Sequence, residues 1–381
     1  MSDYLINTYA RYPVKLVKGQ GSYVYDDKGK KYLDFYGGHA VCLLGHCNPK
    51  IVKAINDQSK KLIFYSNIFE TEPAAQLAEK LAKTLLPKKY KVYFANSGSE
   101  ANETAIKIAR KHTGKHRIVS FRDSFHGRSA ICTSATGIDS YHQFEPNLDS
   151  YTSFAVLGDM KSVKKAAKNN TAAVICEPIQ SIGGINLADA SFYKQLAEFC
   201  KRKVILLIFD EIQTGLGRTG NFWFSKSMGI YPDIITTAKG IAGGLPLSAV
   251  LVRETISKEI KTGQHATTFG GGPVVCAAGI ATVNILTQKN FLKKVKGKNK
   301  YLVKKLKKID GVKGVLGKGF LLGIEFSREI PDLTKTCLKN GLIIGSSYKK
   351  NVFRIMPPLT TSKSEIDEFL RLFQISLASA L

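Results

Sequence analysis

The sequence predicts an α/β protein in which a large domain is built around a mostly parallel mixed sheet and a smaller α+β domain is formed by the two ends of the chain. Between about residues 50 and 285, helical patterns alternate with short apolar strands, which is typical of a parallel sheet covered on both faces. Short strand-like runs lie at residues 14–35, and a strand and a final helix follow the large region. We therefore predict three segments, residues 1–50, 51–285 and 286–381, of which the first and third form the smaller domain.

The individual elements follow from the apolar patterns. A turn at Asp26–Gly29 separates the N-terminal strands. The candidate strands of the large domain are Val92–Ala95, Ile118–Phe121, Ala173–Cys176, Val204–Phe209, Ile234–Thr236 and Ala249–Val252. We expect a long helix at about 274–309, a strand at Leu321–Phe326 and a helix near 363–378. Ligands of parallel sheets bind beyond the carboxyl ends of the strands, so the chemistry is expected in the loops that follow them.

The composition is ordinary for a soluble globular protein. Hydrophobic residues make up 44% of the chain, and the mean hydropathy is -0.08. The apolar runs are too short to span a bilayer, and the first residues lack the pattern of a signal peptide. The seven cysteines are scattered without a CxxC pair, which favours free thiols over a disulfide framework. We expect a cytoplasmic protein with no membrane partner and no metal site.

The net charge of +26 raises nucleic-acid binding as an alternative function. The basic residues are mostly lysines distributed along the whole chain, and the densest cluster, Lys293–Lys308, alternates with apolar residues at helical spacing. Neither zinc-finger spacing nor an RNA-binding aromatic signature accompanies this cluster. We therefore expect no nucleic-acid partner, but a positive field that favours anionic substrates.

A candidate phosphate site follows the first strand of the large domain. In the segment Asn96–Asn102, Ser97 and Glu100 form a capping-box pattern at the start of a helix. Gly98 and Ser99 would then expose backbone N–H groups at the helix N-terminus, where anions bind. An ordinary capped helix is the alternative, because capping boxes are common.

The loop after the second strand presents an aromatic ring, an imidazole and a guanidinium close together. Phe125 can stack on a flat ring, and Arg128 can hold a carboxylate through paired hydrogen bonds. His126 in such a loop is more commonly structural than catalytic.

Two carboxylates follow the apolar run Val204–Phe209. Asp210, at the ligand edge of the sheet, can bind a cationic ring nitrogen and keep a pyridine ring protonated, which makes that ring an electron sink. A strand end that reaches solvent is the alternative. The next segment, Gly215–Gly220, matches GxGxxG, but it does not open a helix directly after a strand, so we interpret it as a tight glycine turn rather than a dinucleotide site.

A lysine with unusual surroundings follows the strand at Ile234. Lys239 lies in a segment of glycine and small residues, whereas most lysines of the chain are in solvated patterns. A partly desolvated lysine has a lowered pKa and can form a Schiff base. Further along, hydroxyl residues adjoin a glycine cluster in His265–Pro273, which is typical of a phosphate or carboxylate contact or of a flexible loop.

Taken together and in this order, these motifs resemble the class III aminotransferases of pyridoxal-phosphate fold type I. The resemblance covers nearly the whole chain, from Gly19–Tyr23 to Arg354–Leu359. Within the family, the chain is most similar to members that transfer the δ-amino group of N2-acetylornithine to 2-oxoglutarate in arginine biosynthesis. The resemblance leaves succinylornithine, ornithine and 4-aminobutyrate open as alternative amino donors.

The resemblance also implies roles for single residues toward the cofactor pyridoxal 5'-phosphate. Lys239 would carry the cofactor and transfer protons, and Asp210 would pair with the ring nitrogen. The other implied cofactor contacts are Gly98 and Ser99 at the phosphate, Phe125 stacked on the ring, Ile212 under it, Gln213 at the ring hydroxyl, Glu211 as a further contact, and Thr268 at the phosphate from the partner subunit of a homodimer. Glu177 would support the cofactor.

For the substrates, the resemblance implies that Arg128 and Thr267 contact the acylated ornithine and that Arg354 binds the α-carboxylate of glutamate or 2-oxoglutarate. Two departures from the family pattern concern this part of the site. Ile182 stands where relatives have a glutamate that pairs with the arginine matching Arg354, so we expect weaker discrimination between the two half-reactions. His39 stands where relatives commonly have an apolar residue, and it is either part of the acyl-group contact or a plain turn residue.

Overall fold

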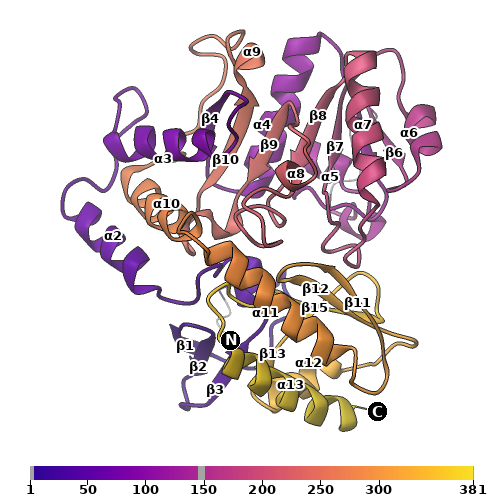
Figure 1. Cartoon of the computed structure of the whole chain (residues 1–381). Helices are drawn as coiled ribbons and strands as arrows, with labels where there is room; N and C mark the ends of the chain where they lie inside the picture. Colours follow the sequence, from indigo (N-terminus) through magenta and orange to yellow (C-terminus); the bar gives the residue numbers. More distant parts are fainter. Residues whose placement is uncertain (1–3, 145–150, 381) are drawn as a thin grey trace.

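A seven-stranded sheet is the centre of the large part of the molecule, within residues 4–144 and 151–380, which the computed structural model describes (Figure 1). Its strand order is β4-β10-β9-β8-β7-β5-β6. The strands are β4 (Tyr90–Ala95), β5 (Arg117–Phe121), β6 (Thr152–Ala155), β7 (Thr171–Cys176), β8 (Leu206–Asp210), β9 (Ile234–Thr237) and β10 (Ser248–Arg253). All of them run in one direction except β10, which is antiparallel to both of its neighbours.

The two faces of this sheet are covered by different helices because successive side chains of a strand point to opposite sides. Ala173, Ile175, Leu206 and Ile208 join the buried alanines and isoleucines of α4 (Gly98–Thr113) in one cluster. Val174, Cys176, Leu207 and Phe209 join residues of α6 (Met160–Ala166) and α7 (Ala190–Lys203) in another. Asp210 continues the series Leu206–Ile208 and therefore faces α4.

The large part of the molecule contains further helices besides α4, α6 and α7. They are α2 (Pro49–Ser59), α3 (Glu72–Lys83), α5 (Ala130–Ala135), α8 (Phe224–Ser227), α9 (Glu254–Ser257) and α10 (Pro273–Leu286), with short 3-10 turns η1 (Asp139–Tyr141) and η2 (Lys239–Ala242). In the part of the chain that the structure describes, no helix is both long and apolar enough to span a membrane.

The two ends of the chain meet in the lower part of Figure 1. There β1 (Leu16–Gln20), β2 (Tyr23–Asp26) and β3 (Lys31–Asp34) form a sheet with β13 (Leu342–Ile343), which pairs parallel to β3. A second sheet contains β11 (Val312–Lys318), β12 (Leu321–Phe326), β15 (Val352–Ile355) and β14 (Gly345–Ser346). The helices α11 (Phe291–Leu306), α12 (Leu333–Lys339) and α13 (Lys363–Ala378) belong to the same region. The domain bounds at residues 50 and 285 stay a prediction.

The structure corrects three details of the predicted elements. The single helix expected at 274–309 is two helices, α10 and α11, because Asn290 adopts a left-handed conformation with φ of 67° between them. Val204 is not part of a buried strand, since it ends α7 with its side chain 72% exposed. The short edge strand β6 was not predicted, because its sequence Thr-Ser-Phe-Ala has little apolar character.

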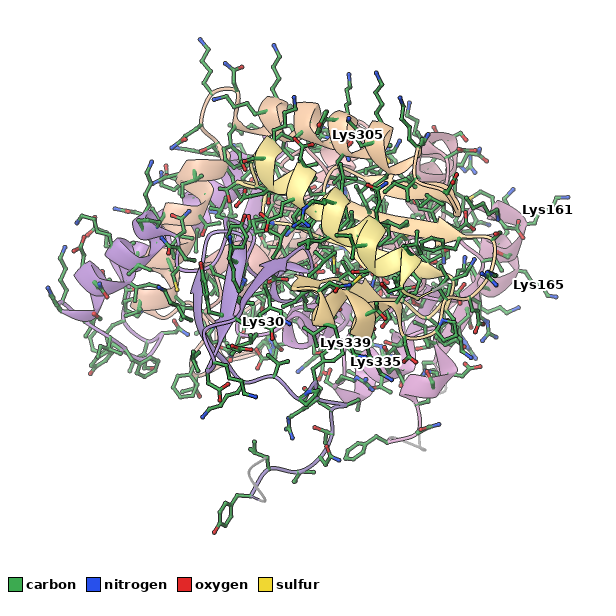
Figure 2. All side chains as sticks on the ribbon, turned by 90° about the horizontal axis from the view of Figure 1, so that it is seen from below. Lys30, Lys161, Lys165, Lys305, Lys335 and Lys339 are labelled. Atoms are coloured by element: carbon green, nitrogen blue, oxygen red, sulfur yellow. The ribbon has the colours of Figure 1, made fainter. Side chains whose placement is uncertain are left out.

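The lysines project outward from several elements rather than from one. Figure 2 shows Lys30, Lys161, Lys165, Lys305, Lys335 and Lys339 at the molecular surface, and they come from the β2–β3 turn, α6, α11 and α12. The cluster Lys293–Lys308 lies mainly on α11, whose inner side buries Val295, Leu302 and Leu306, so its amphipathic interpretation is confirmed.

Candidate active site

The loops predicted to carry chemistry all leave the same edge of the large sheet. The strands β4, β5, β7, β8 and β9 run in one direction, so their carboxyl ends lie together. The segments that begin at Asn96, Arg122, Glu177, Glu211 and Ala238 follow these ends directly. The site is therefore assembled from short loops on a rigid sheet, as expected for this fold class.

The start of α4 has the capping box that the sequence predicts. The Ser97 hydroxyl accepts from the Glu100 backbone N–H at 3.2 Å, and the Glu100 carboxylate accepts from the Ser97 N–H at 3.1 Å. The N–H groups of Gly98 and Ser99 belong to the first turn, which has no acceptor within the helix. A side chain at Gly98 would collide with Ile212, because an added Cβ would lie 2.8 Å from its Cδ1. The helix start and the loop after β8 are therefore in direct contact.

Asp210 is held by two buried neighbours from different elements. Its Oδ2 accepts from Asn102 Nδ2 of α4 at 2.7 Å and lies 2.8 Å from Nδ1 of His126. Its Oδ1 accepts from the Ile212 backbone N–H at 3.1 Å. Asn102 itself is fixed by Thr236, whose hydroxyl donates to Asn102 Oδ1 at 2.7 Å. A carboxylate oxygen can accept more than one hydrogen bond, so Oδ1 retains capacity for a cationic donor.

Lys239 lies in the electrostatic field of this carboxylate. Desolvation lowers the pKa of its amine, and Arg354 lowers it further, while Asp210 and Glu177 oppose the shift. The residue has a φ of 46°, a left-handed conformation that is rare for a lysine. Such backbone outliers occur preferentially at functional sites. The result is an amine with an increased unprotonated fraction close to a buried carboxylate.

Glu177 and Phe125 connect the loops after β7 and β5. The Glu177 carboxylate accepts from the Phe125 backbone N–H at 2.7 Å. Burial raises the pKa of Glu177, Asp210 raises it further, and His126 acts in the opposite direction. The Phe125 ring packs edge-on against Tyr141, with 5.2 Å between the ring centroids.

Arg354 is buried beside these loops and donates only to neutral oxygens among its described contacts. Its Nε donates to the Ser346 carbonyl at 2.6 Å, its Nη1 to the Ser181 hydroxyl at 3.2 Å, and its Nη2 to the Tyr36 hydroxyl at 3.0 Å. The Ser181 hydroxyl in turn donates to Gln213 Oε1 at 3.0 Å. Ile182, next to Ser181, supplies no carboxylate to this arginine.

A second guanidinium, that of Arg128, lies over an aromatic ring. Its central carbon is 4.1 Å from the centroid of the Tyr141 ring. The ring face attracts the cation and leaves its N–H groups able to bind a carboxylate. Thr267 accepts from Asn96 Nδ2 at 3.2 Å, whereas the neighbouring Thr268 is exposed.

The side chain of Glu211 makes its hydrogen bonds with the start of α8. Its two carboxylate oxygens accept from the backbone N–H groups of Phe224 and Ser225 at 2.7 and 2.9 Å. Glu211 therefore fixes the start of α8, and its contact with a cofactor stays a prediction.

Sequence reasoning missed the residues that hold the predicted ones in place. These are Asn102, His126 as a partner of Asp210, Ser181, and Tyr36 as a partner of Arg354. Asn102 gave a usable signal, because a polar residue on the apolar side of a helix with Ala105 and Ala109 indicates a buried partner. Tyr36 gave none, since it lies 318 residues before Arg354 in the chain.

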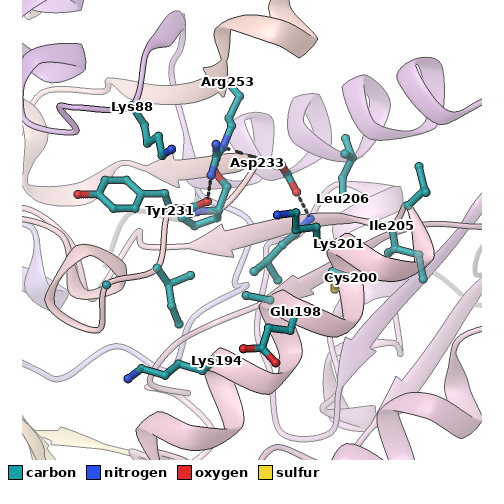
Figure 3. Close-up of a pocket in the computed structure, with 16 residues that line it drawn as sticks. Lys88, Lys194, Glu198, Cys200, Lys201, Ile205, Leu206, Tyr231, Asp233 and Arg253 are labelled. Carbon is teal, nitrogen blue, oxygen red and sulfur yellow. Dashed lines mark hydrogen bonds and ion pairs between the residues drawn. The ribbon is translucent and has the colours of Figure 1, made fainter.

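A separate hollow lies at the opposite edge of the sheet (Figure 3). It has a volume of about 580 Å³, and its lining includes Lys194 and Lys201 of α7, with Leu206 and Asp233 at the amino ends of β8 and β9. Its lining contains none of the predicted cofactor-binding, catalytic or substrate-binding residues.

The arrangement fits the cofactor that the resemblance implies. Two free N–H groups at the start of a 16-residue helix suit a phosphate, a buried carboxylate suits a ring nitrogen, and an amine with a lowered pKa suits an aldehyde. The contact of Ile212 with Gly98 brings the first two features together.

Comparison with known proteins agrees with this interpretation. The family model described as "Aminotransferase class-III" matches residues 5–377. The acetylornithine aminotransferase of Aquifex aeolicus is 43% identical over 370 residues, which cover 96% of this chain and 97% of that protein.

Two solved structures extend the comparison to the fold. The ornithine aminotransferase of Toxoplasma gondii has a TM-score of 0.91 at 28% identity, covering 99% of this chain and 93% of that one. The N-acetylornithine aminotransferase of Stenotrophomonas maltophilia has a TM-score of 0.85 at 30% identity, with 97% of each chain covered. The likeness therefore extends over the whole architecture.

Proposed function

The chain belongs to the class III aminotransferases, and from this premise we propose that it transfers the δ-amino group of N2-acetyl-L-ornithine to 2-oxoglutarate. The products are N-acetylglutamate 5-semialdehyde and L-glutamate, in a step of arginine biosynthesis that we place in the cytoplasm. The near full-length likeness to an acetylornithine aminotransferase supports this choice of substrate. Its cofactor is pyridoxal 5'-phosphate.

The observation that carries the proposal is the placement of Asp210 and Lys239 at one edge of the sheet: Asp210 ends β8 and pairs in register with Thr236 of β9, three residues before Lys239. When bound, the cofactor supplies an electron-withdrawing ring that stabilises negative charge on the substrate carbon next to nitrogen. Asp210 would keep the ring nitrogen protonated, and Asn102 and His126 would hold that carboxylate in place. Gly98 and Ser99 would bind the phosphate, with Phe125, Ile212 and Gln213 around the ring.

Lys239 would move the protons of the reaction. A general base works best when its pKa lies near the working pH, and desolvation lowers the pKa of Lys239 in that direction. Its amine would take the proton from the substrate carbon next to the transferred nitrogen and return a proton during the exchange.

The two guanidinium groups would orient the two substrates in turn. Arg128, over the Tyr141 ring, would bind the acylated ornithine together with Thr267. Arg354 would bind the α-carboxylate of 2-oxoglutarate or glutamate, because its charge faces neutral acceptors and no carboxylate among the described residues. Both substrates carry carboxylate groups, and 2-oxoglutarate is a dianion, which suits the positive charge of the chain.

We further propose a homodimer with shared sites. Large apolar side chains are exposed in one segment and near Thr268: Ile63 at 68%, Ile68 at 82%, Phe69 at 59% and Phe269 at 65%. A hollow of about 670 Å³ beside them is lined by Asn67, Thr267 and Thr268. Exposed apolar surface of this kind favours association with a second copy, which would bring Thr268 to the partner's phosphate site.

A donor panel tests the proposed substrate. We expect kcat/KM with 2-oxoglutarate as acceptor to be highest for N-acetylornithine and lower for N-succinylornithine, ornithine and 4-aminobutyrate. A higher value for any of the other three donors would overturn the proposed substrate, although a class III aminotransferase would remain.

A further inference from the structure

The turn that follows β3 is an unusual stretch of backbone next to the candidate site. Gly37, Gly38, His39 and Ala40 all have left-handed φ angles, of 58°, 56°, 65° and 64°. Left-handed conformations cost free energy for residues with a side chain, so such a run persists only where its surroundings hold it. Asp34 supplies part of this support, because its carboxylate accepts from the N–H groups of Gly37 at 2.8 Å and Gly38 at 2.9 Å.

The result of this turn is a contact between two side chains that lie three residues apart. The hydroxyl oxygen of Tyr36 lies 2.5 Å from Nδ1 of His39, and the two rings meet edge-on with centroids 5.0 Å apart. The same hydroxyl accepts from Nη2 of Arg354 at 3.0 Å. Tyr36 therefore joins the turn to the buried arginine.

One hydrogen-bond direction in this chain is fixed by chemistry, and we assign the other. A guanidinium has only donors, so the Tyr36 oxygen accepts from Arg354, and we assign its own proton to His39 Nδ1. His39 must then be neutral, with its proton on Nε2. Burial together with the charges of Arg354 and Lys239 lowers the pKa of His39 to about 3, which agrees with a neutral ring.

Arg354 is thereby fixed on three sides, by Ser346, Ser181 and Tyr36. A guanidinium carries one N–H on Nε and a pair on each terminal nitrogen. The three contacts use the Nε proton and one proton on each terminal nitrogen. One N–H remains on Nη1 and one on Nη2, and two such donors can bind the two oxygens of one carboxylate.

We propose that Tyr36 is a positioning residue for Arg354, with His39 as the acceptor that orients its hydroxyl. The inference rests on the proposed function, since it assigns the remaining donors of Arg354 to the α-carboxylate of 2-oxoglutarate and glutamate. Tyr36 takes the place of a charged partner: it holds the guanidinium without neutralising it, so no carboxylate has to move away when the keto acid enters. The predicted effect is confined to the half-reaction that uses Arg354.

The test compares the two half-reactions in the holoenzyme. We expect Tyr36→Phe, which keeps the ring and removes the hydroxyl, to raise the KM for 2-oxoglutarate about 10-fold, the effect of one lost hydrogen bond to a charged group. The rate with N-acetylornithine in the first half-reaction should change less than about 2-fold, because Arg128 does not contact Tyr36 through a hydrogen bond. Tyr23→Phe is the matched control, since its hydroxyl donates to Glu368 far from the site.

Variants of His39 separate orientation from packing. Asparagine tolerates left-handed backbone and places an acceptor near the position of Nδ1, so His39→Asn should keep the KM for 2-oxoglutarate within about 3-fold. His39→Leu removes the acceptor and should raise this KM. In the double variant of His39→Leu and Tyr36→Phe, the KM for 2-oxoglutarate should not rise above that of Tyr36→Phe alone. Both substitutions interrupt the same chain of hydrogen bonds, so their effects should not add.

An unchanged KM for 2-oxoglutarate in Tyr36→Phe, or an equal loss in both half-reactions, would overturn the inference. Cofactor absorbance and thermal unfolding of each variant show whether the fold is intact. The half-reaction that uses Arg354 can be measured with glutamate as the amino donor, so it does not need N-acetylornithine. Wild-type turnover of N-acetylornithine, measured in the same series, therefore tests the proposed substrate separately.

Discussion

Asp210 owes its placement to residues that contact neither solvent nor, in the proposed mechanism, the substrate. Asn102 donates to its Oδ2 at 2.7 Å, is itself oriented by Thr236, and lies on the buried side of α4. A buried carboxylate without such donors becomes harder to keep ionised, since desolvation disfavours the charged form. The ability of Asp210 to keep a ring nitrogen protonated therefore depends on Asn102 and His126 as well.

We expect Asn102→Ala to lower kcat roughly 10-fold at saturating cofactor, because Asp210 loses one hydrogen bond to its charged group. Steady-state kinetics with excess pyridoxal phosphate measure this. Asn340→Ala is the matched control, since Asn340 donates to Ser376 in the C-terminal region. A variant of Asn102 with wild-type kcat would show that Asp210 needs no such support.

At the scale of elements, the phosphate contact depends on how α4 begins. The capping box of Ser97 and Glu100 satisfies N–H groups near the helix start and leaves those of Gly98 and Ser99 for a ligand. An equivalent capping box, formed by Ser362 and Glu365, begins α13 in the C-terminal region. The chain thus contains its own comparison between a cap at the candidate site and a cap elsewhere.

Ser97→Ala and Ser362→Ala should each lower the free energy of unfolding by about 1 kcal/mol, the usual contribution of an N-cap. Only Ser97→Ala should also weaken the binding of pyridoxal phosphate, because only α4 contacts it in the proposed site. Denaturant unfolding and cofactor titration measure the two quantities. Equal cofactor affinities of the two variants would argue against a phosphate at α4.

Local patterns predicted the elements and their common edge, but not the contacts between distant segments. The strands β7 and β12 and the helix α13 follow from apolar periodicity, and the cap of α4 follows from residues three positions apart. The bonds Asn102–Asp210 and Tyr36–Arg354 join residues 108 and 318 positions apart. Such pairs depend on how whole elements pack, and no periodicity within one element records them. The side to which Glu211 turns was missed for the same reason.

For the whole molecule, the proposed homodimer makes each site a product of two chains. Lys239 would come from one subunit and Thr268 from the other. Phe269, the residue after Thr268, is exposed, and so are apolar residues within 63–69. The two exposed segments are in contact, because the ring centroids of Phe64 and Phe269 are 5.3 Å apart.

Mixing two inactive or weakened variants tests this sharing. A mixed dimer of Lys239→Ala and Thr268→Ala subunits contains one site with both residues intact if Thr268 acts across the interface. Re-associated mixtures should therefore gain activity and cofactor affinity over either parent. If Thr268 acts within its own subunit, mixing restores nothing, and the proposed sharing is wrong.

The central claim is that the Lys239 amine holds the cofactor while Asp210 faces its ring nitrogen. Borohydride reduction of the holo-protein, followed by peptide mass spectrometry, tests it most directly, because reduction makes a lysine–cofactor bond permanent. We predict one pyridoxyl group, on the peptide that contains Lys239, and none after Lys239→Ala. A protein without the adduct, or with the adduct on another lysine, would contradict the account.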